Sequence, residues 1–299
     1  MPRFLAALVA LLILLPQEST AESQKAVLVT GASTGIGRKI TEHLAARGYF
    51  VYAGARKQAD LDALSAIKNV QAVKLDVTRE DDIAAAVATI TKAGRGLYGL
   101  VNNAGVATVA SATETTVEEF TLIMDVNLFG PWRVTRAFAP MIIAGKGRIT
   151  TIGSISGILA PRDLTAYAMS KHAMEAFADS MAVQMAPLGV QVSIVEPGNF
   201  DSDIGKSATR RTGKESRFTD RSKYKKPDEV AAAVEQALFE ATPKRRYMVT
   251  PDQREAEITI RKQIEQLVQL NEGQPYAYDR DALMKMLDEA LATARPKAQ

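Results

Sequence analysis

A short apolar strand that leads directly into a glycine-rich turn constrains the fold of this chain more than any other feature. The predicted strand covers 25–30, and the turn after it carries three glycines within 31–37. The strand is continuously apolar rather than alternating, which is typical of parallel strands that helices cover on both faces. Apolar residues at a spacing of four then predict a helix over 35–47. This strand–turn–helix unit is typical of a parallel α/β sheet.

The alternation of strand and helix continues through most of the sequence. Further strands are predicted over 49–54, 70–75, 97–101, 148–152 and 190–195, with helices over 79–92, 116–143 and 164–186. Thr116 and Glu119 form a capping-box pattern at the start of the longest helix. The pattern favours a doubly wound parallel sheet of about seven strands with helices on both faces. We expect one domain over 22–250 and a helical extension over 251–299.

Composition narrows the classes of function. The net charge of the 299 residues is +3, which is too small to indicate a nucleic-acid partner. The chain has no cysteine, so disulfides, thiolate chemistry and Cys-based metal sites are excluded. Its only histidines are His43 and His172, which argues against a histidine-rich metal centre or a His-dependent triad. No metal site is predicted.

The glycine turn is suited to the phosphates of a dinucleotide. Gly31, Gly35 and Gly37 allow the backbone to approach a pyrophosphate closely. The helix that follows offers unpaired N–H groups and a positive dipole end to the same phosphates. A Walker A loop is excluded because no Gly-Lys-Ser/Thr closes the turn. The sequence therefore predicts a dinucleotide cofactor.

The end of the second strand indicates which dinucleotide is bound. An acid there binds the ribose 2′-hydroxyl of NAD, whereas a basic residue accommodates the 2′-phosphate of NADP. Arg56 and Lys57 follow the strand, and no carboxylate follows before Asp60. We therefore predict NADP(H) in preference to NAD(H), with Arg56 on the phosphate; the alternative is an Arg56 merely exposed in a loop. Asp76, after the third strand, is expected to meet the adenine or to cap the next helix.

A serine, a tyrosine and a lysine form a candidate site of proton transfer. Ser154 follows the strand over 148–152, and Tyr167 and Lys171 lie one helical turn apart on the helix over 164–186. A phenol has a pKa of about 10, and the charge of Lys171 is expected to lower the pKa of Tyr167. The result would be an acid/base closer to working pH. Ser154 is expected to hold a substrate oxygen in line with the phenol. The pair alone is common in helices, but its combination with Ser154 and the dinucleotide turn indicates catalysis.

Other motifs stand at fixed places along the chain. They are Thr30 to Gly37, Asn102-Asn103-Ala104-Gly105, Asp125-Val126-Asn127, the set of Ser154, Tyr167 and Lys171, and Pro197-Gly198. Together these motifs resemble the short-chain dehydrogenases/reductases over 25–249. The resemblance implies a single Rossmann-type domain that transfers hydride between a nicotinamide and a carbonyl or secondary alcohol. The residues over 190–200 resemble the branch that handles steroids and retinoids, which implies a hydrophobic small-molecule substrate.

The resemblance also implies roles for individual residues. Asn127 would hold a water that links Lys171 to solvent, and Lys171 would also bond the nicotinamide ribose. Asn103 would contact the cofactor near the central sheet, and Ser202 stands where the family often has a threonine that contacts the carboxamide. The predicted catalytic residues are Asn127, Ser154, Tyr167 and Lys171. The predicted cofactor-binding residues are Gly31, Ser33, Thr34, Gly35, Ile36, Gly37, Arg56, Asp76, Val77, Asn103, Tyr167, Lys171, Pro197, Gly198 and Ser202.

Three alternative functions stay open at this point. A nucleotide-binding regulatory protein could keep the fold and lose catalysis, although this chain keeps all four polar residues of the catalytic set. An NAD-dependent alcohol dehydrogenase would use the same residues with the other cofactor. An isomerase or epimerase would use a bound nicotinamide transiently, but the modest C-terminal part argues against a large sugar-nucleotide domain.

The chain becomes less regular after the sixth strand. Nine Lys or Arg and two acids lie within 206–226, which predicts a mobile solvated loop or a lid over the substrate that favours an anionic one. Helices are then predicted over 253–270 and 280–294, with an apolar stripe expected to pack on the domain or on a partner subunit. The long helices around Asn127 and Tyr167 resemble those that the family uses to form a homodimer or homotetramer.

The first 21 residues form a segment of a different kind. Arg3 precedes an apolar run over 4–15, and small residues follow up to Ala21. The run is short for a bilayer span, which needs about 20 residues. It predicts a signal peptide cleaved after Ala21, or an uncleaved anchor. We therefore expect a protein that is exported to the periplasm or secreted, or membrane-associated; it would be cytoplasmic if the segment has no function.

Overall fold

The computed structural model describes residues 24–213, 215 and 219–294. The signal peptide or anchor predicted over 1–21, with its cleavage after Ala21, lies outside the described residues. None of the helices in the described ranges is long and apolar enough to cross a membrane.

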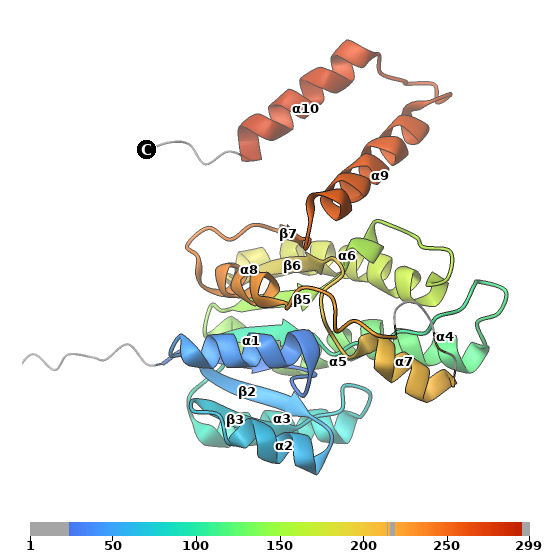
Figure 1. Ribbon diagram of the computed structural model, residues 1–299. Coiled ribbons are helices and arrows are strands. Elements are labelled where there is room, and N and C mark those ends of the chain that lie inside the picture. Colours follow the sequence, from blue (N-terminus) through green and yellow to red (C-terminus); the bar gives the residue numbers. More distant parts are fainter. Residues whose placement is uncertain (1–23, 214, 216–218, 295–299) are drawn as a thin grey trace, which may run out of the picture.

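Within the described part of the chain, seven parallel strands form one sheet in the order β3-β2-β1-β4-β5-β6-β7 (Figure 1). The strands are β1 Ala26–Val29, β2 Phe50–Ala55, β3 Val70–Lys74, β4 Gly99–Asn102, β5 Arg148–Ile152, β6 Gln191–Pro197 and β7 Arg246–Val249. The strand order reverses between β1 and β4, which is where open α/β sheets bind their ligands. The predicted doubly wound Rossmann-type sheet of about seven strands is confirmed.

Helices cover both faces of this sheet. Successive residues of a strand point to opposite faces, and here Val27 packs with α1, α2 and α8 whereas Leu28 packs with α3, α5 and α6. Both side chains are fully buried, which explains why the strand is apolar without alternation. The helices are α1 Gly35–Ala46, α2 Gln58–Ser65, α3 Glu80–Ala93, α4 Val117–Met124, α5 Gly130–Ala144, α6 Thr165–Met185, α7 Ile204–Thr212, α8 Asp228–Phe239, α9 Gln253–Asn271 and α10 Arg280–Ala294.

The long helix predicted over 116–143 contains a turn of π-helix. Asp125–Phe129 forms this turn between α4 and α5. The predicted capping box is present, since Glu119 N donates to Thr116 Oγ1 over 3.2 Å and Thr116 N donates to Glu119 Oε2 over 3.1 Å. Single π turns inside helices are frequent at functional sites, and this one carries Asn127.

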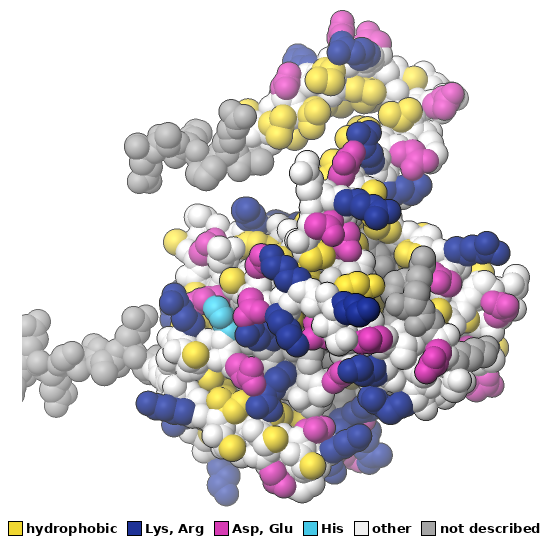
Figure 2. All heavy atoms as spheres, viewed as in Figure 1, with side chains coloured by type: hydrophobic (Ala, Val, Ile, Leu, Met, Phe, Trp, Pro, Cys, Tyr) yellow, Lys and Arg dark blue, Asp and Glu magenta, His cyan; other side chains and the backbone are white. Residues whose placement is uncertain are grey.

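The C-terminal extension is helical as predicted, but its apolar stripe does not pack on the domain. α9 begins beside β7 and leads away from the sheet, and α10 stands away from it in Figure 1. Ile260, Ile264 and Leu267 are 50%, 55% and 52% exposed, and Figure 2 shows hydrophobic side chains on the surface of the extension. The expectation that the stripe packs on the domain is therefore wrong, because amphipathic spacing predicts an apolar face and not what that face contacts. Packing on a partner subunit stays a prediction.

Candidate active site

The glycine turn at the end of β1 has the geometry that a dinucleotide phosphate requires. Gly31 and Gly35 have φ angles of 64° and 56°, a region that favours glycine. A Cβ on Gly37 would lie 2.3 Å from Asn103 Nδ2 and from Gly31 O, so only glycine fits there. α1 begins with no acidic residue in its first turn, and Thr34 makes no side-chain cap. The N–H groups of this helix end are thus suited to an anion.

Asn103 and Thr30 hold the glycine turn from the neighbouring strand. Asn103 Nδ2 donates to Thr30 O over 2.8 Å and to Gly31 O over 3.0 Å. Thr30 Oγ1 accepts from the backbone N–H groups of Asn103 and Ala104, each over 3.0 Å. Because both N–H groups of the Asn103 side-chain amide and its backbone N–H are engaged, the side chain positions the turn, and a contact from Asn103 to a cofactor would use one of its oxygens.

A cleft of about 660 Å³ runs along the carboxyl ends of the strands. Every residue predicted to bind the cofactor lines this cleft, as do Ser154, Tyr167 and Lys171 of the predicted catalytic set. Asn127 is the exception, since it does not line the cleft and is only 2% exposed. The cleft therefore joins the glycine turn to the Ser154–Tyr167–Lys171 set.

Arg56 and Asp76 lie together where the cleft meets the ends of β2 and β3. Arg56 Nη1 lies 3.6 Å from Asp76 Oδ2, and the Arg56 side chain is 64% exposed. Asp76 Oδ1 accepts from Thr78 N over 3.0 Å and from Thr78 Oγ1 over 2.7 Å. Burial opposes ionisation of Asp76, but these hydrogen bonds and the charge of Arg56 together hold its pKa below the usual range. Asp76 thus closes a local turn before α3, while most of the Arg56 guanidinium faces solvent.

Tyr167, Lys171 and Ser154 meet at the centre of the cleft. Lys171 Nζ donates to Ile152 O over 2.8 Å and lies 5.6 Å from the centre of the Tyr167 ring. Ser154 Oγ accepts from Ser156 N over 3.0 Å and lies 3.5 Å from Pro197 O. The two side chains of α6 therefore point into the same space as the serine after β5.

Burial shifts the pKa values of the two reactive side chains in opposite directions. Burial raises the pKa of the Tyr167 phenol, and the Ser154 hydroxyl and the charge of Arg221 only partly offset this. Burial lowers the pKa of Lys171 to about 8, although the charge of Glu175 raises it in part. The expectation that the pKa of Tyr167 would be low is thus wrong for the protein alone, because desolvation outweighs the Ser154 hydrogen bond and the charge of Arg221.

Asn127 connects the π turn to the helix that carries the reactive groups. Asn127 Nδ2 donates to Val106 O over 2.9 Å and to Ser170 Oγ over 3.0 Å, and its Oδ1 accepts from Val106 N over 2.8 Å. Ser170 in turn donates to Tyr167 O over 2.7 Å. Both amide N–H groups of Asn127 are used, so a water held by this residue would need an oxygen of its side chain or backbone.

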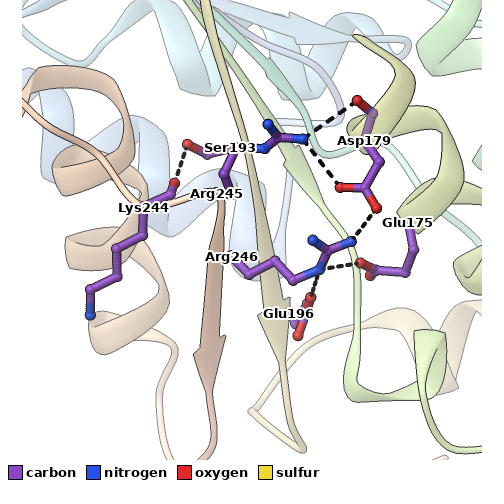
Figure 3. A network of polar contacts seen from close by, with 7 residues as sticks. All are labelled: Glu175, Asp179, Ser193, Glu196, Lys244, Arg245 and Arg246. Atoms are coloured by element: carbon purple, nitrogen blue, oxygen red, sulfur yellow. Dashed lines mark hydrogen bonds and ion pairs between the residues drawn. The ribbon is translucent and has the colours of Figure 1, made fainter. Parts of the chain in front are cut away.

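A network of acids and arginines joins α6 to β6 and β7 (Figure 3). Arg246 Nε lies 3.2 Å from Glu175 Oε2 and 3.5 Å from Glu196 Oε1, and Arg246 Nη2 lies 2.7 Å from Asp179 Oδ2. Burial raises the pKa of Glu175. Burial and the charge of Glu175 together raise the pKa of Glu196 to about 8. Holding a proton at neutral pH is therefore favoured for the Glu175–Glu196 pair, and Glu196 stands directly before Pro197 in the cleft wall.

Three arginines that were not individually predicted also line the cleft, namely Arg211, Arg221 and Arg254. Arg211 and Arg221 belong to the basic segment 206–226, whose first part forms α7. The composition of that segment was the signal that could have found them, but it does not tell which charges face inward. Among the described residues, no group of three or more His, Asp or Glu is arranged to hold a metal ion.

The sequence matches known dehydrogenases. The family model described as short chain dehydrogenase matches residues 25–213. The chain is 36% identical over 193 residues to mitochondrial D-beta-hydroxybutyrate dehydrogenase of Rattus norvegicus, covering 61% of this chain and 56% of that enzyme. It is also 36% identical over 211 residues to retinol dehydrogenase 5 of Mus musculus, covering 68% of this chain and 66% of the relative. The match thus spans just over half the length of the rat enzyme.

The fold matches solved dehydrogenase structures over most of the chain. A short-chain dehydrogenase from Streptomyces avermitilis superimposes with a TM-score of 0.70 at 30% identity, covering 85% of this chain and 99% of that one. An alcohol dehydrogenase from the archaeon Thermococcus sibiricus, complexed with 5-hydroxy-NADP, superimposes with a TM-score of 0.67 at 26% identity. The match covers 76% of this chain and 96% of that one. The chain therefore belongs to the short-chain dehydrogenase/reductase family of oxidoreductases.

Proposed function

We propose that this protein is an NADP(H)-dependent oxidoreductase that interconverts a carbonyl and a secondary alcohol on a small organic molecule. The observation that carries the proposal is that Ser154, Tyr167 and Lys171 share one cleft with the glycine turn. When bound, the nicotinamide cofactor supplies or accepts the hydride. The protein must then supply the proton, orient the substrate oxygen and stabilise the charge that develops on it.

The side chains of the cleft divide these tasks among them. In the direction of reduction, the neutral Tyr167 phenol donates its proton to the carbonyl oxygen, and the Ser154 hydroxyl holds that oxygen beside the phenol. Lys171 is positively charged below pH about 8 and favours the phenolate that is left behind. Asn127 bonds Ser170 beside Lys171 and lies in the π turn, and in this proposal one of its oxygens holds the water that returns a proton.

Arg56 supports the choice of NADP(H) over NAD(H). It lies at the end of β2, where a basic residue accommodates a 2′-phosphate, and its guanidinium is largely exposed beside the cleft. Asp76 is the nearest acid, but Thr78 occupies one of its oxygens and Arg56 itself faces the other. The Thermococcus sibiricus neighbour was solved with 5-hydroxy-NADP, which is consistent with this choice.

The experiment measures binding and oxidation of NADPH and NADH by wild type and by Arg56→Ala. Loss of charged hydrogen bonds to the 2′-phosphate is expected to raise the Kd for NADPH by about 10–100-fold and to leave the Kd for NADH nearly unchanged. Wild type is expected to oxidise NADPH steadily with at least one member of a panel of steroids, retinoids, quinones, sugars, ketones and oxo acids. Lys68→Ala, which removes an exposed charge away from the cleft, is the control.

Two results would count against the proposal. An equal loss of affinity for both cofactors in Arg56→Ala would contradict the preference for NADP(H). Tight binding of NADPH with no oxidation by any class of carbonyl would instead favour the regulatory binding protein.

A further inference from the structure

Among the described residues of the basic segment 206–226, Arg211 and Arg221 place their guanidinium groups at the cleft wall. Arg211 Nη2 donates to Ala107 O over 2.7 Å and lies near Arg56, toward the cofactor end. Arg221 is placed differently, because its charge acts on the Tyr167 phenol. Of these two side chains, Arg221 is therefore the cation that lies in the part of the cleft that holds Tyr167.

Three contacts fix the position of the Arg221 head group. Arg221 Nη1 donates to Ser202 Oγ over 3.3 Å, and Arg221 Nη2 donates to Asn199 Oδ1. Its guanidinium carbon lies 5.2 Å from the centre of the Tyr224 ring. Two of these partners, Asn199 and Ser202, lie just after Gly198 in the loop that follows β6. A held and planar guanidinium of this kind is preorganised for a carboxylate.

The charge of Arg221 has no direct counter-ion among the described residues. Its contacts there are a hydroxyl and an amide oxygen, and Arg221 Nε is buried without a hydrogen-bond partner. Glu255 lies beyond Asn199, and its two oxygens accept from Asn199 N over 2.8 Å and Asn199 Nδ2 over 2.7 Å. The nearest acid is thus engaged by an intervening amide. A partly buried cation without a paired anion is costly unless a ligand completes it.

The other acids that line the cleft are also engaged within the protein. Asp203 lies 3.9 Å from Lys206 Nζ, and Asp252 accepts from Glu255 N as the cap of α9. Asp76 bonds Thr78 near the end of β3. None of these groups lies within ion-pair distance of Arg221 in the described part of the chain.

From this arrangement we infer that Arg221 binds the carboxylate of an anionic substrate, an oxo acid or hydroxy acid, and so places the substrate's reacting carbon beside Tyr167 and Ser154. The inference rests on the proposed function and narrows its substrate class. One of the two predictions for the segment 206–226 is a lid that favours an anionic substrate. Arg221 is the residue of that segment that would bind the anion. The hydrophobic substrate implied by the resemblance to steroid and retinoid enzymes is the competing expectation.

The test compares short 2-, 3- and 4-oxo acids with their methyl esters in NADPH-dependent reduction. Each ester keeps the carbonyl and loses the negative charge, so wild type is expected to favour at least one acid over its ester by about 10–100-fold in kcat/KM. Arg221→Gln is expected to lose most of that preference through a higher KM for the acid. Its effect on the Tyr167 phenol would change kcat for acid and ester alike, so the acid-to-ester ratio of kcat/KM is the readout. Arg221→Lys should keep part of the preference because it keeps the charge.

Lys223→Gln is the matched control, since Lys223 is an exposed cation of the same segment. It should leave the acid-to-ester ratio unchanged. The Kd for NADPH is measured for each variant, because a loss of NADPH affinity in Arg221→Gln would assign Arg221 to a phosphate of the cofactor and overturn the inference.

The remaining outcomes separate this inference from the proposed function. Reduction of neutral ketones, steroids or retinoids in preference to every oxo acid would overturn the role of Arg221 and leave the proposed function intact. An equal loss with acid and ester in Arg221→Gln would make Arg221 a structural residue only. No oxidation of NADPH with any carbonyl would overturn both.

Discussion

Lys171 and Tyr167 are four residues apart on α6, and burial moves their pKa values in opposite directions. The pKa of Lys171 is about 8, so its amine is mostly charged at neutral pH. The pKa of Tyr167 is raised, so its phenol keeps its proton. A neutral phenol beside a cation can donate a proton and leave a stabilised phenolate, which suits the reduction of a carbonyl.

Single residues were predictable where a local motif fixes their role. The glycine turn and the Ser154, Tyr167 and Lys171 set are recognisable from spacing, and the structure brings them into one cleft. The direction of the Tyr167 pKa shift was not predictable, because burial depends on residues distant in the sequence. Arg221 was also not predictable as an individual, since the composition of its segment gives a charge but no orientation.

At the scale of elements, α6, β6 and β7 enclose the Glu175–Glu196–Arg246 contacts (Figure 3). Glu196 has a pKa of about 8 in the folded protein against 4.5 as its ordinary value. Between these two values the folded state holds a proton that the unfolded state has lost, so the free energy of unfolding falls as pH rises. The slope approaches about 1.4 kcal/mol per pH unit for one full proton.

Glu196→Gln is expected to remove much of this fall, because glutamine fills the same space and does not ionise. Urea unfolding of wild type and Glu196→Gln between pH 5 and 9 measures the effect, with the exposed Glu289→Gln as the control. Parallel stability curves for wild type and Glu196→Gln would show that the Glu196 carboxyl does not hold the proton.

The elements themselves were predictable to different degrees. Largely apolar runs marked six strands to within one or two residues, because strands that helices cover on both faces consist mostly of apolar residues. The π turn inside the helix over 116–143 was missed, since one extra residue hardly disturbs the apolar periodicity. α7 was not recognised within the basic segment, where no apolar stripe marks a helix.

At the scale of the whole molecule, the described residues expose apolar side chains at the start of α5 and on the C-terminal extension, and the surface at α5 is expected to be an interface between subunits. Phe129 and Trp132, at the junction of the π turn and α5, are 48% and 46% exposed. The C-terminal extension exposes Leu270 at 78%. We propose that the protein is a homodimer or homotetramer that buries the Phe129–Trp132 surface, because aromatic residues are enriched at the centre of interfaces.

Light scattering measures the mass of wild type, Trp132→Glu and Leu270→Glu against the 32.3 kDa of one chain. Wild type is expected to have two or four times this mass. Trp132→Glu is expected to form a monomer, because it places a charge in the interface, and Leu270→Glu should behave like wild type. A monomer with Leu270→Glu and not with Trp132→Glu would move the interface to the α9–α10 extension.

Proton donation by Tyr167, in the cleft that also holds the glycine turn, is the central step of the proposed reaction. Single-turnover oxidation of bound NADPH, with a carbonyl that wild type reduces, tests this most directly in Tyr167→Phe. Tyr276→Phe, which changes an 82% exposed phenol, is the control. We expect Tyr167→Phe to slow the turnover by about 10²–10⁴-fold while the Kd for NADPH stays unchanged. Oxidation by Tyr167→Phe at the wild-type rate would contradict the account.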